Sequence, residues 1–309
     1  MWGKVSTSPG RRNLLVFHLE SINWQRVQAF PEAFPNLTAL MEESRTYRAC
    51  YASATSTQMV MAAFLHGNDF EMDAAPEISA PAGNQPGLFG VLEEAGYSTA
   101  FLVASALPGK PILKALAGSL PAPWATHDFG ALLNRLDATV VEKPFAVYVW
   151  SLVPHMEANL ALAPHARRVG DLVAGSCAVV DNLLGATIEI LRRRDLLSST
   201  TIVVLGDHGD DFWTHGFKNG MLHGVEPYTP LVHVPLVIRD PDIEPGIDRR
   251  LVSTVDLRST CLDLLGLPNA RTFAHGGGSI LDEPGRTIAF SQNFTAGQRD
   301  SHWMDVRKT

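Results

Sequence analysis

Short runs of branched apolar residues recur along this chain and alternate with helical patterns, and this alternation constrains the fold most strongly. The apolar runs are short and continuous, which is typical of buried strands; they cover 13–19, 98–103, 145–153, 201–205 and 234–239. Helices are predicted between them at 35–44, 87–96, 171–197 and 256–265. We therefore expect an α/β fold, an α/β/α sandwich with a mostly parallel central sheet and a small C-terminal subdomain.

No internal repeat or low-complexity linker divides the 309 residues. The simplest organisation is one catalytic domain over residues 1–309, with a smaller C-terminal portion at roughly 240–309.

Charge and cysteine content argue against several classes of protein. The net charge of -7, with no long Lys/Arg run, argues against a nucleic-acid-binding surface. Three widely spaced cysteines make neither a disulfide framework nor a zinc cluster. The N-terminus lacks the apolar core of a secretory signal, and the longest apolar stretches are too short to span a bilayer. We therefore expect a cytoplasmic protein without a membrane segment; the sequence predicts no oligomeric state.

Polar side chains follow three of the predicted strands at the point where each strand ends. Glu20 follows the first, His155 follows the strand at 145–153, and Asp207 with His208 follows the strand at 201–205. Ligands of open α/β sheets bind at this edge. Two carboxylates and an imidazole suit Zn²⁺, Mn²⁺ or another borderline divalent ion. A GDHG tetrapeptide alone is more often a structural turn, so the metal interpretation depends on the other motifs.

Small hydroxyl residues at 52–58 (ASATSTQ) precede the apolar run at 59–65. This pattern predicts a helix N-terminus, where free backbone N–H groups favour an anion. Thr55, Ser56 and Thr57 are therefore candidates for a nucleophile, or they only cap the helix.

Several motifs in order resemble the alkaline phosphatase/sulfatase superfamily along nearly all of the chain. The segment at 194–209 (RDLLSSTTIVVLGDHG) is similar to that family's helix, turn, strand and D-H-G loop. The segments at 235–239 (PLVIR) and 251–268 (LVSTVDLRSTCLDLLGLP) resemble the strand and helix that follow, and 149–155 resembles the strand that ends in a substrate-side histidine. The resemblance implies one or two divalent metals and chemistry at a phosphate or sulfate ester.

The resemblance also implies metal ligands. Glu20 matches the first acidic ligand, and Asp207 and His208 match the two ligands on the later loop. The single acid at Glu20 is similar to the threonine-nucleophile group of phosphoethanolamine transferases and lipoteichoic acid synthases, whereas common sulfatases carry two adjacent aspartates there. The C/S-x-P-S-R motif of sulfatases is missing, and Cys50 lies too far upstream and lacks the following Pro and Arg.

By the same resemblance, Thr57 is the favoured nucleophile and a further metal ligand. Thr55 is the rival, and Ser56 between them stays open.

The histidines divide into two groups. The resemblance implies substrate binding by His155, His223 and His215. His18 and His233 alternate with apolar residues in predicted strands, which predicts buried, hydrogen-bonded histidines.

The sequence thus predicts a metal-dependent hydrolase or transferase that acts on a phosphate mono- or diester through a threonine nucleophile. The substrate is expected to be a small anionic ester, and the metal Zn²⁺ or Mn²⁺, with room for a second metal near His223. Two alternatives remain: a sulfatase-like sulfuric ester hydrolase without formylglycine, and a non-catalytic binding protein that retains the fold.

Overall fold

The computed structural model describes residues 11–67, 86–105, 120–142, 144–155, 169–212, 221–224, 226–269, 276–282, 284–292 and 303–306. Eight strands form the main sheet: β1 (Asn13–Leu19), β2 (Arg45–Tyr51), β3 (Ser98–Ala104), β4 (Pro123–Thr126), β5 (Phe145–Ser151), β6 (Thr200–Gly206), β9 (Leu236–Arg239) and β10 (Gly246–Ser253). Two small sheets pair β7 (Asp211–Phe212) with β8 (Met221–Leu222) and β11 (Ala289–Gln292) with β12 (Trp303–Val306). The helices are α1 (Trp24–Ala29), α2 (Pro35–Glu42), α3 (Thr57–His66), α4 (Leu88–Glu94), α6 (Phe129–Thr139), α8 (Val169–Arg193), α9 (Thr229–Val232) and α10 (Leu257–Leu264).

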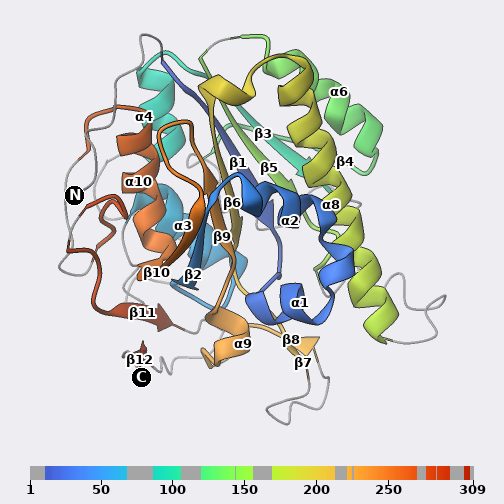
Figure 1. The fold of residues 1–309 in the computed structure, drawn as a ribbon, viewed down its shortest axis with the longest axis vertical. Coiled ribbons are helices and arrows are strands. Elements are labelled where there is room, and N and C mark those ends of the chain that lie inside the picture. The colour runs from blue at the N-terminus through green and yellow to red at the C-terminus, as the bar shows by residue number, and fades with distance from the viewer. Residues whose placement is uncertain are drawn as a thin grey trace.

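The main sheet has the strand order β10-β2-β9-β6-β1-β5-β3-β4 (Figure 1). β9 runs antiparallel to both of its neighbours, β2 and β6, and the other neighbouring strands are parallel. The predicted α/β sandwich with a mostly parallel sheet is therefore confirmed.

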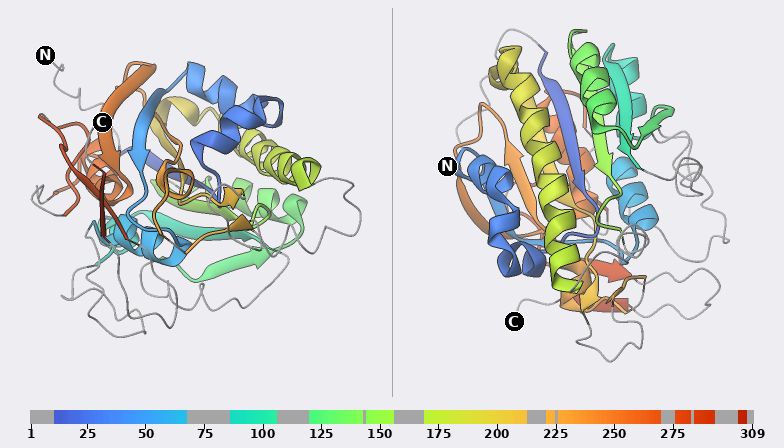
Figure 2. Two further views of the ribbon diagram at one scale, coloured as in Figure 1. Left: turned by 90° about the horizontal axis from the view of Figure 1, so that it is seen from below. Right: turned by 90° about the vertical axis from the view of Figure 1, so that its right-hand side faces the viewer.

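Helices cover both faces of this sheet (Figures 1 and 2). Along β1, Leu15 and Phe17 pack with α1, α2, α6 and α8, while Leu14 and Val16 pack with α3, α4 and α10. Because side chains alternate along a strand, His18 belongs to the same face as Leu14 and Val16. His18, the last polar residue of β1, is therefore on the face of the sheet that packs against α3.

α8 is, within the described part of the chain, the helix that is long and apolar enough to cross a membrane by length and composition. The stretch concerned is Asp171–Arg193, and 56% of its most apolar window is buried inside the fold. Cys177, Val180 and Leu184 are fully buried in the cluster between α8 and the sheet. This burial is typical of a core helix of an α/β protein.

The carboxyl ends of β1, β5 and β6 lie side by side, because β1 pairs in parallel with β5 on one side and β6 on the other. α3 begins at this end of the sheet, since its first residue contacts the segments that follow β1 and β6. The β7–β8 pair and α9 lie at the same end (Figure 1). These loops enclose the site described next.

Candidate active site

Thr57 is the first residue of α3, and its hydroxyl contacts two other predicted site residues. Its Oγ1 lies 3.1 Å from Oε1 of Glu20 and 2.9 Å from Nε2 of His208. Ser56, the N-cap residue, is extended and makes no side-chain capping bond. The first backbone N–H groups of α3 are therefore not capped by Ser56, which suits an anion close to Thr57.

Thr55 is also buried, but its contacts differ from those of Thr57. Its carbonyl accepts the backbone N–H of Gly224 at 2.7 Å, and its own N–H donates to the carbonyl of Gln292 at 3.1 Å. The backbone of Thr55 thus holds the loop that carries His223. This arrangement favours Thr57 over Thr55 as the reacting hydroxyl, and the choice stays a prediction.

Asp207 and His208 leave the sheet between two tightly packed glycines. A Cβ atom at Gly206 would clash with the carbonyl oxygen of Ile22, and one at Gly209 would clash with that of Pro230. The backbone therefore approaches its neighbours more closely than any other residue would permit. This packing explains the glycines of the GDHG motif and fixes the direction of the two side chains between them.

One oxygen of each carboxylate is anchored by an N–H donor. The backbone N–H of Ser21 donates to Oδ1 of Asp207 at 2.9 Å. Ser21 adopts a positive φ of 55°, so the chain turns directly after Glu20. The indole Nε1 of Trp150 donates to Oε2 of Glu20 at 2.7 Å.

Burial and mutual repulsion separate the acidities of these carboxyl groups. Burial first, and then the nearby charge of Asp207, raise the pKa of Glu20 well above its ordinary value. Burial alone would raise the pKa of Asp207 too, but His208 and His18 outweigh it and lower that pKa below its ordinary value. A cation beside them would favour the ionised form of both carboxylates.

The donor set fits a divalent cation. His18, Glu20 and Asp207 each offer a ligand atom, these atoms lie within 4.8 Å of one another, and all three residues are fully buried. Nε2 of His18 and Oδ2 of Asp207 have no hydrogen-bond partner among the described residues. Such atoms are costly to bury unless something binds them, and a metal ion would bind both.

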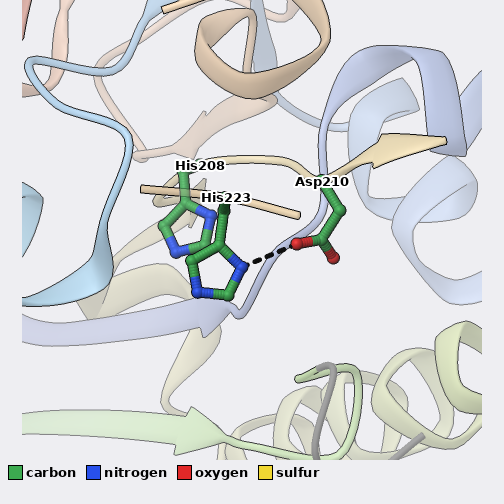
Figure 3. Close-up of side chains that lie close together, drawn as sticks. All are labelled: His208, Asp210 and His223. Carbon is green, nitrogen blue, oxygen red and sulfur yellow. Dashed lines mark hydrogen bonds and ion pairs between the residues drawn. The ribbon is translucent and has the colours of Figure 1, made fainter. Parts of the chain in front are cut away.

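A second cluster adjoins the first and contains His208, Asp210 and His223 (Figure 3). Nδ1 of His223 lies 2.7 Å from Oδ1 of Asp210, and the imidazole rings of His208 and His223 are 4.4 Å apart. Oδ2 of Asp210 accepts a hydrogen bond from Arg26 at 3.0 Å, and both partners are fully buried. Asp210 thus holds one ring nitrogen of His223 and turns the ring toward His208.

Titration of this second cluster follows from these contacts. Burial opposes ionisation of Asp210, but the bond from His223 and the charges of His223 and Arg26 lower its pKa to about 2. Burial would likewise lower the pKa of His223, but its bond to Asp210 outweighs that effect and raises it. Because a raised pKa favours the positively charged form of His223, this side chain favours an anionic ligand.

The other predicted histidines lie at different distances from this centre. The ring of His155 is 5.3 Å from that of His223, so the structure brings it to the edge of the site. His215 lies outside the described residues. His233 is half-buried, and its Nε2 lies 2.8 Å from the carbonyl oxygen of Arg48, as expected for a structural histidine.

Sequence reasoning missed several residues of the site, and two of them carried a signal. His18 is buried and lies 3.1 Å from the hydroxyl of Tyr148, as predicted, but it also faces the acidic pair. Its position two residues before Glu20 places both on one face of a strand. Asp210 is part of the DHGDD run at 207–211. Arg26 and Trp150 gave no signal, because their role depends on contacts between distant segments.

Comparison with known proteins agrees with this geometry. A family model described as Sulfatase matches residues 122–267. This segment therefore resembles a sulfatase-family domain. Arylsulfatase K of Danio rerio is 37% identical over 141 residues, which cover 41% of this chain and 25% of that protein. Arylsulfatase K of Homo sapiens is 34% identical over 93 residues, which cover 30% of this chain and 17% of that protein. The matched region is thus a quarter or less of these two relatives.

Solved structures extend the likeness to nearly the whole fold. The phosphonate monoester hydrolase of Agrobacterium radiobacter has a TM-score of 0.71 at 18% identity and covers 92% of this chain and 80% of that one. The C-terminal periplasmic domain of EptC from Escherichia coli, in complex with Zn, has a TM-score of 0.70 at 13% identity and covers 98% and 94%. The lipoteichoic acid synthase LtaP of Listeria monocytogenes has a TM-score of 0.70 at 14% identity and covers 92% and 78%. The chain therefore has the alkaline phosphatase-like fold.

The expected cytoplasmic location is wrong. The finding that overturns it is the kind of relative that the chain matches, which includes the arylsulfatase K proteins and the periplasmic EptC domain. The error arose because the sequence reasoning took the lack of a recognisable leader at the N-terminus as an indication of compartment.

Proposed function

We propose that this chain is a metal-dependent enzyme that cleaves or transfers a phosphate mono- or diester with Thr57 as the nucleophile. One observation carries the proposal. The hydroxyl of Thr57, at the first position of a helix, lies within 3.1 Å of both an acidic and an imidazole side chain of the expected metal site.

Glu20, Thr57, Asp207 and His208 would hold the divalent metal. Their oxygen and nitrogen donors suit Zn²⁺ or Mn²⁺, and the EptC domain of the same fold was solved with Zn. When bound, such an ion polarises the phosphoryl oxygens and lowers the pKa of an attacking hydroxyl.

The side chains around Thr57 provide the remaining functions. Oγ1 of Thr57 would attack phosphorus and form phosphothreonine as the ester alcohol leaves, and water or an acceptor alcohol would then release the phosphate. Oε1 of Glu20 lies 3.1 Å from the hydroxyl and can accept its proton, whereas Nε2 of His208, 2.9 Å from the hydroxyl, would bind the metal. His223, held by Asp210, and His155 beside it would bind the anionic oxygens of the substrate.

A sulfatase-like activity is the second candidate, because the family model and the arylsulfatase K relatives favour it. The matched segment at 122–267 contains Asp207 and His208 but neither Glu20 nor Thr57, so it carries no information on the nucleophile. Cys50, the cysteine nearest to Thr57 in sequence, is buried, and burial raises the pKa of its thiol. We propose the phosphate ester as the first candidate because Thr57, and no cysteine, contacts Glu20 and His208 among the described residues.

The test compares turnover of p-nitrophenyl phosphate, bis-p-nitrophenyl phosphate and p-nitrophenyl sulfate by the metal-loaded protein. The variants are Thr57→Ala, Thr57→Ser and Thr55→Ala. Thr55→Ala removes the rival hydroxyl two positions before Thr57 and so serves as the matched comparison. We expect phosphate ester cleavage, lost in Thr57→Ala and partly retained in Thr57→Ser. Cleavage of the sulfate ester alone would establish the second candidate, and full activity in Thr57→Ala would refute the nucleophile.

A further inference from the structure

We propose that His18 is an additional protein ligand of the metal, so that two imidazoles rather than one hold the ion. This inference rests on the metal site of the proposed function. It concerns a residue that the sequence patterns assign to the core and that no motif of the site includes.

Six donor atoms of five residues form a closed ring of short distances. Oδ2 of Asp207 lies 3.3 Å from Nε2 of His18 and 3.3 Å from Nε2 of His208. Nε2 of His208 lies 2.9 Å from Oγ1 of Thr57, which lies 3.1 Å from Oε1 of Glu20. The ring closes at the other oxygen of Glu20, Oε2, which lies 3.7 Å from Nε2 of His18.

These spacings match those between ligand atoms of one ion. For metal–donor bonds of about 2.0–2.2 Å, neighbouring ligand atoms in tetrahedral to octahedral arrangements lie about 3.0–3.5 Å apart. Four of the five edges fall near that range, and the fifth joins the oxygen of Glu20 that also accepts the Trp150 indole. His18 therefore occupies a ligand position in the ring and not a place behind it.

The surroundings of His18 hold its ring in one orientation. Its plane stacks on the Trp150 ring with centroids 5.3 Å apart and an angle of 7° between them. Its Nδ1 lies 3.1 Å from the hydroxyl of Tyr148. When Nδ1–H donates to that hydroxyl, the lone pair of Nε2 is free and points toward Asp207 and Glu20, which is the usual arrangement of a metal-binding histidine.

Burial makes this lone pair informative. Nε2 of His18 and Oδ2 of Asp207 lie 3.3 Å apart, and neither makes a well-aligned hydrogen bond within the described ranges, although both residues are fully buried. One ion would satisfy both atoms. A donor set with two imidazoles also favours Zn²⁺ over Mg²⁺ or Ca²⁺, which prefer oxygen ligands.

The competing explanation is that His18 only orients Asp207 from behind. Both explanations predict weaker metal binding when His18 is changed, since loss of an outer-shell partner already costs about 10–100-fold in metal affinity. The number of imidazoles on the metal separates them, because only a ligand contributes to that number.

The experiment is X-ray absorption spectroscopy of the protein loaded with one zinc per chain. It compares the parent protein with His18→Gln, with His223→Gln and with His127→Gln, an exposed histidine that follows the edge strand β4. Zinc affinity is measured in parallel by competition with a chromophoric chelator. Circular dichroism and thermal unfolding establish that each variant is folded.

We expect two imidazoles on zinc in the parent, His223→Gln and His127→Gln proteins, and one in His18→Gln, with zinc affinity lowered at least about 100-fold. A single imidazole in the parent protein would overturn the inference and leave the proposed function intact. A parent protein that binds no zinc or manganese would instead contradict the proposed function. If His18→Gln fails to fold, two imidazoles that persist in both His223→Gln and His155→Gln assign the second one to His18.

Discussion

Oγ1 of Thr57 lies 2.9 Å from Nε2 of His208, although 151 positions separate the two residues in the sequence. The contact exists because α3 begins where β6 ends, at the carboxyl edge of a parallel sheet. It joins the first turn of a helix to a loop that two close-packed glycines hold in place. The predictions below follow from this junction and from the contacts that support it.

Removal of divalent metal is expected to abolish turnover and to lower the midpoint of thermal unfolding. Glu20 and Asp207 are fully buried side by side, so a cation that neutralises them stabilises the folded protein. At free metal about 100-fold above the dissociation constant, the gain is about 2.7 kcal/mol. Scanning calorimetry with chelator and then with added zinc or manganese measures it, and an unfolding midpoint that does not respond to metal would contradict the expectation.

Trp150→Phe is expected to weaken metal binding about 10–100-fold while the protein stays folded. The change removes the indole N–H that donates to Oε2 of Glu20 at 2.7 Å and so releases the orientation of that carboxylate. An unpaired buried acceptor costs about 1–3 kcal/mol of folding free energy. Metal titration measures the first effect, and urea unfolding of the metal-free protein measures the second.

Trp124→Phe is the control for that experiment, since Trp124 is 36% exposed on β4. It should bind metal as tightly as the parent protein. Equal losses in the two variants would mean that the indole of Trp150 has no specific role.

Arg26→Met is expected to lower the free energy of unfolding by about 3–5 kcal/mol, because the buried carboxylate of Asp210 then lacks the guanidinium that pairs with it. The ion pair spans 3.0 Å and both side chains are fully buried. Arg194→Met breaks a pair with Asp137 whose side chains are 42% and 35% exposed, and it should leave stability nearly unchanged. Urea unfolding of both variants checks the contrast, and similar losses in the two would contradict it.

The contribution of Asp210 to stability should disappear in acid. The pKa of Asp210 falls from an ordinary 3.8 to about 2 in the folded protein. Its ionised form therefore stabilises the fold fully at pH values above the pKa of the unfolded chain, and this stabilisation is lost as pH falls through the pKa of the folded protein. The stability gap between the parent and Asp210→Asn should be constant between about pH 5 and 6, below the titration of His223, and should narrow by about 2 kcal/mol as pH falls toward the folded pKa of Asp210. Urea unfolding across this pH range tests it, and a gap that stays constant to the lowest pH would refute the assignment.

The sequence predicted the elements whose pattern is local. The apolar runs ending at Leu19 and Leu205 became β1 and β6, and the polar residues after them reached one edge of the sheet. The sequence predicted that Glu20, Asp207 and His208 lie close together, because parallel strands end at the same edge of a sheet. The small hydroxyl residues that precede an apolar helix indicated Thr55, Ser56 and Thr57 alike, and the family resemblance favoured Thr57.

What the sequence could not predict depends on pairs of distant segments. His18 has the alternation of a core residue, and only the neighbouring β5, with Tyr148 and Trp150, shows which way its ring turns. Asp210 acquires its role from Arg26, 184 positions away, and from His223. A strand pattern fixes the face of a side chain but not the partner opposite to it.

The most direct test of the central claim is to find the residue that carries phosphate during turnover. The metal-loaded protein is mixed with bis-p-nitrophenyl phosphate, quenched in acid, digested and mapped by mass spectrometry, with Thr57→Ala and Thr55→Ala treated alike. The account predicts phosphothreonine at Thr57 in the parent and in Thr55→Ala, and none in Thr57→Ala. Phosphate on Thr55 instead, or steady turnover by the Thr57→Ala protein, would contradict it.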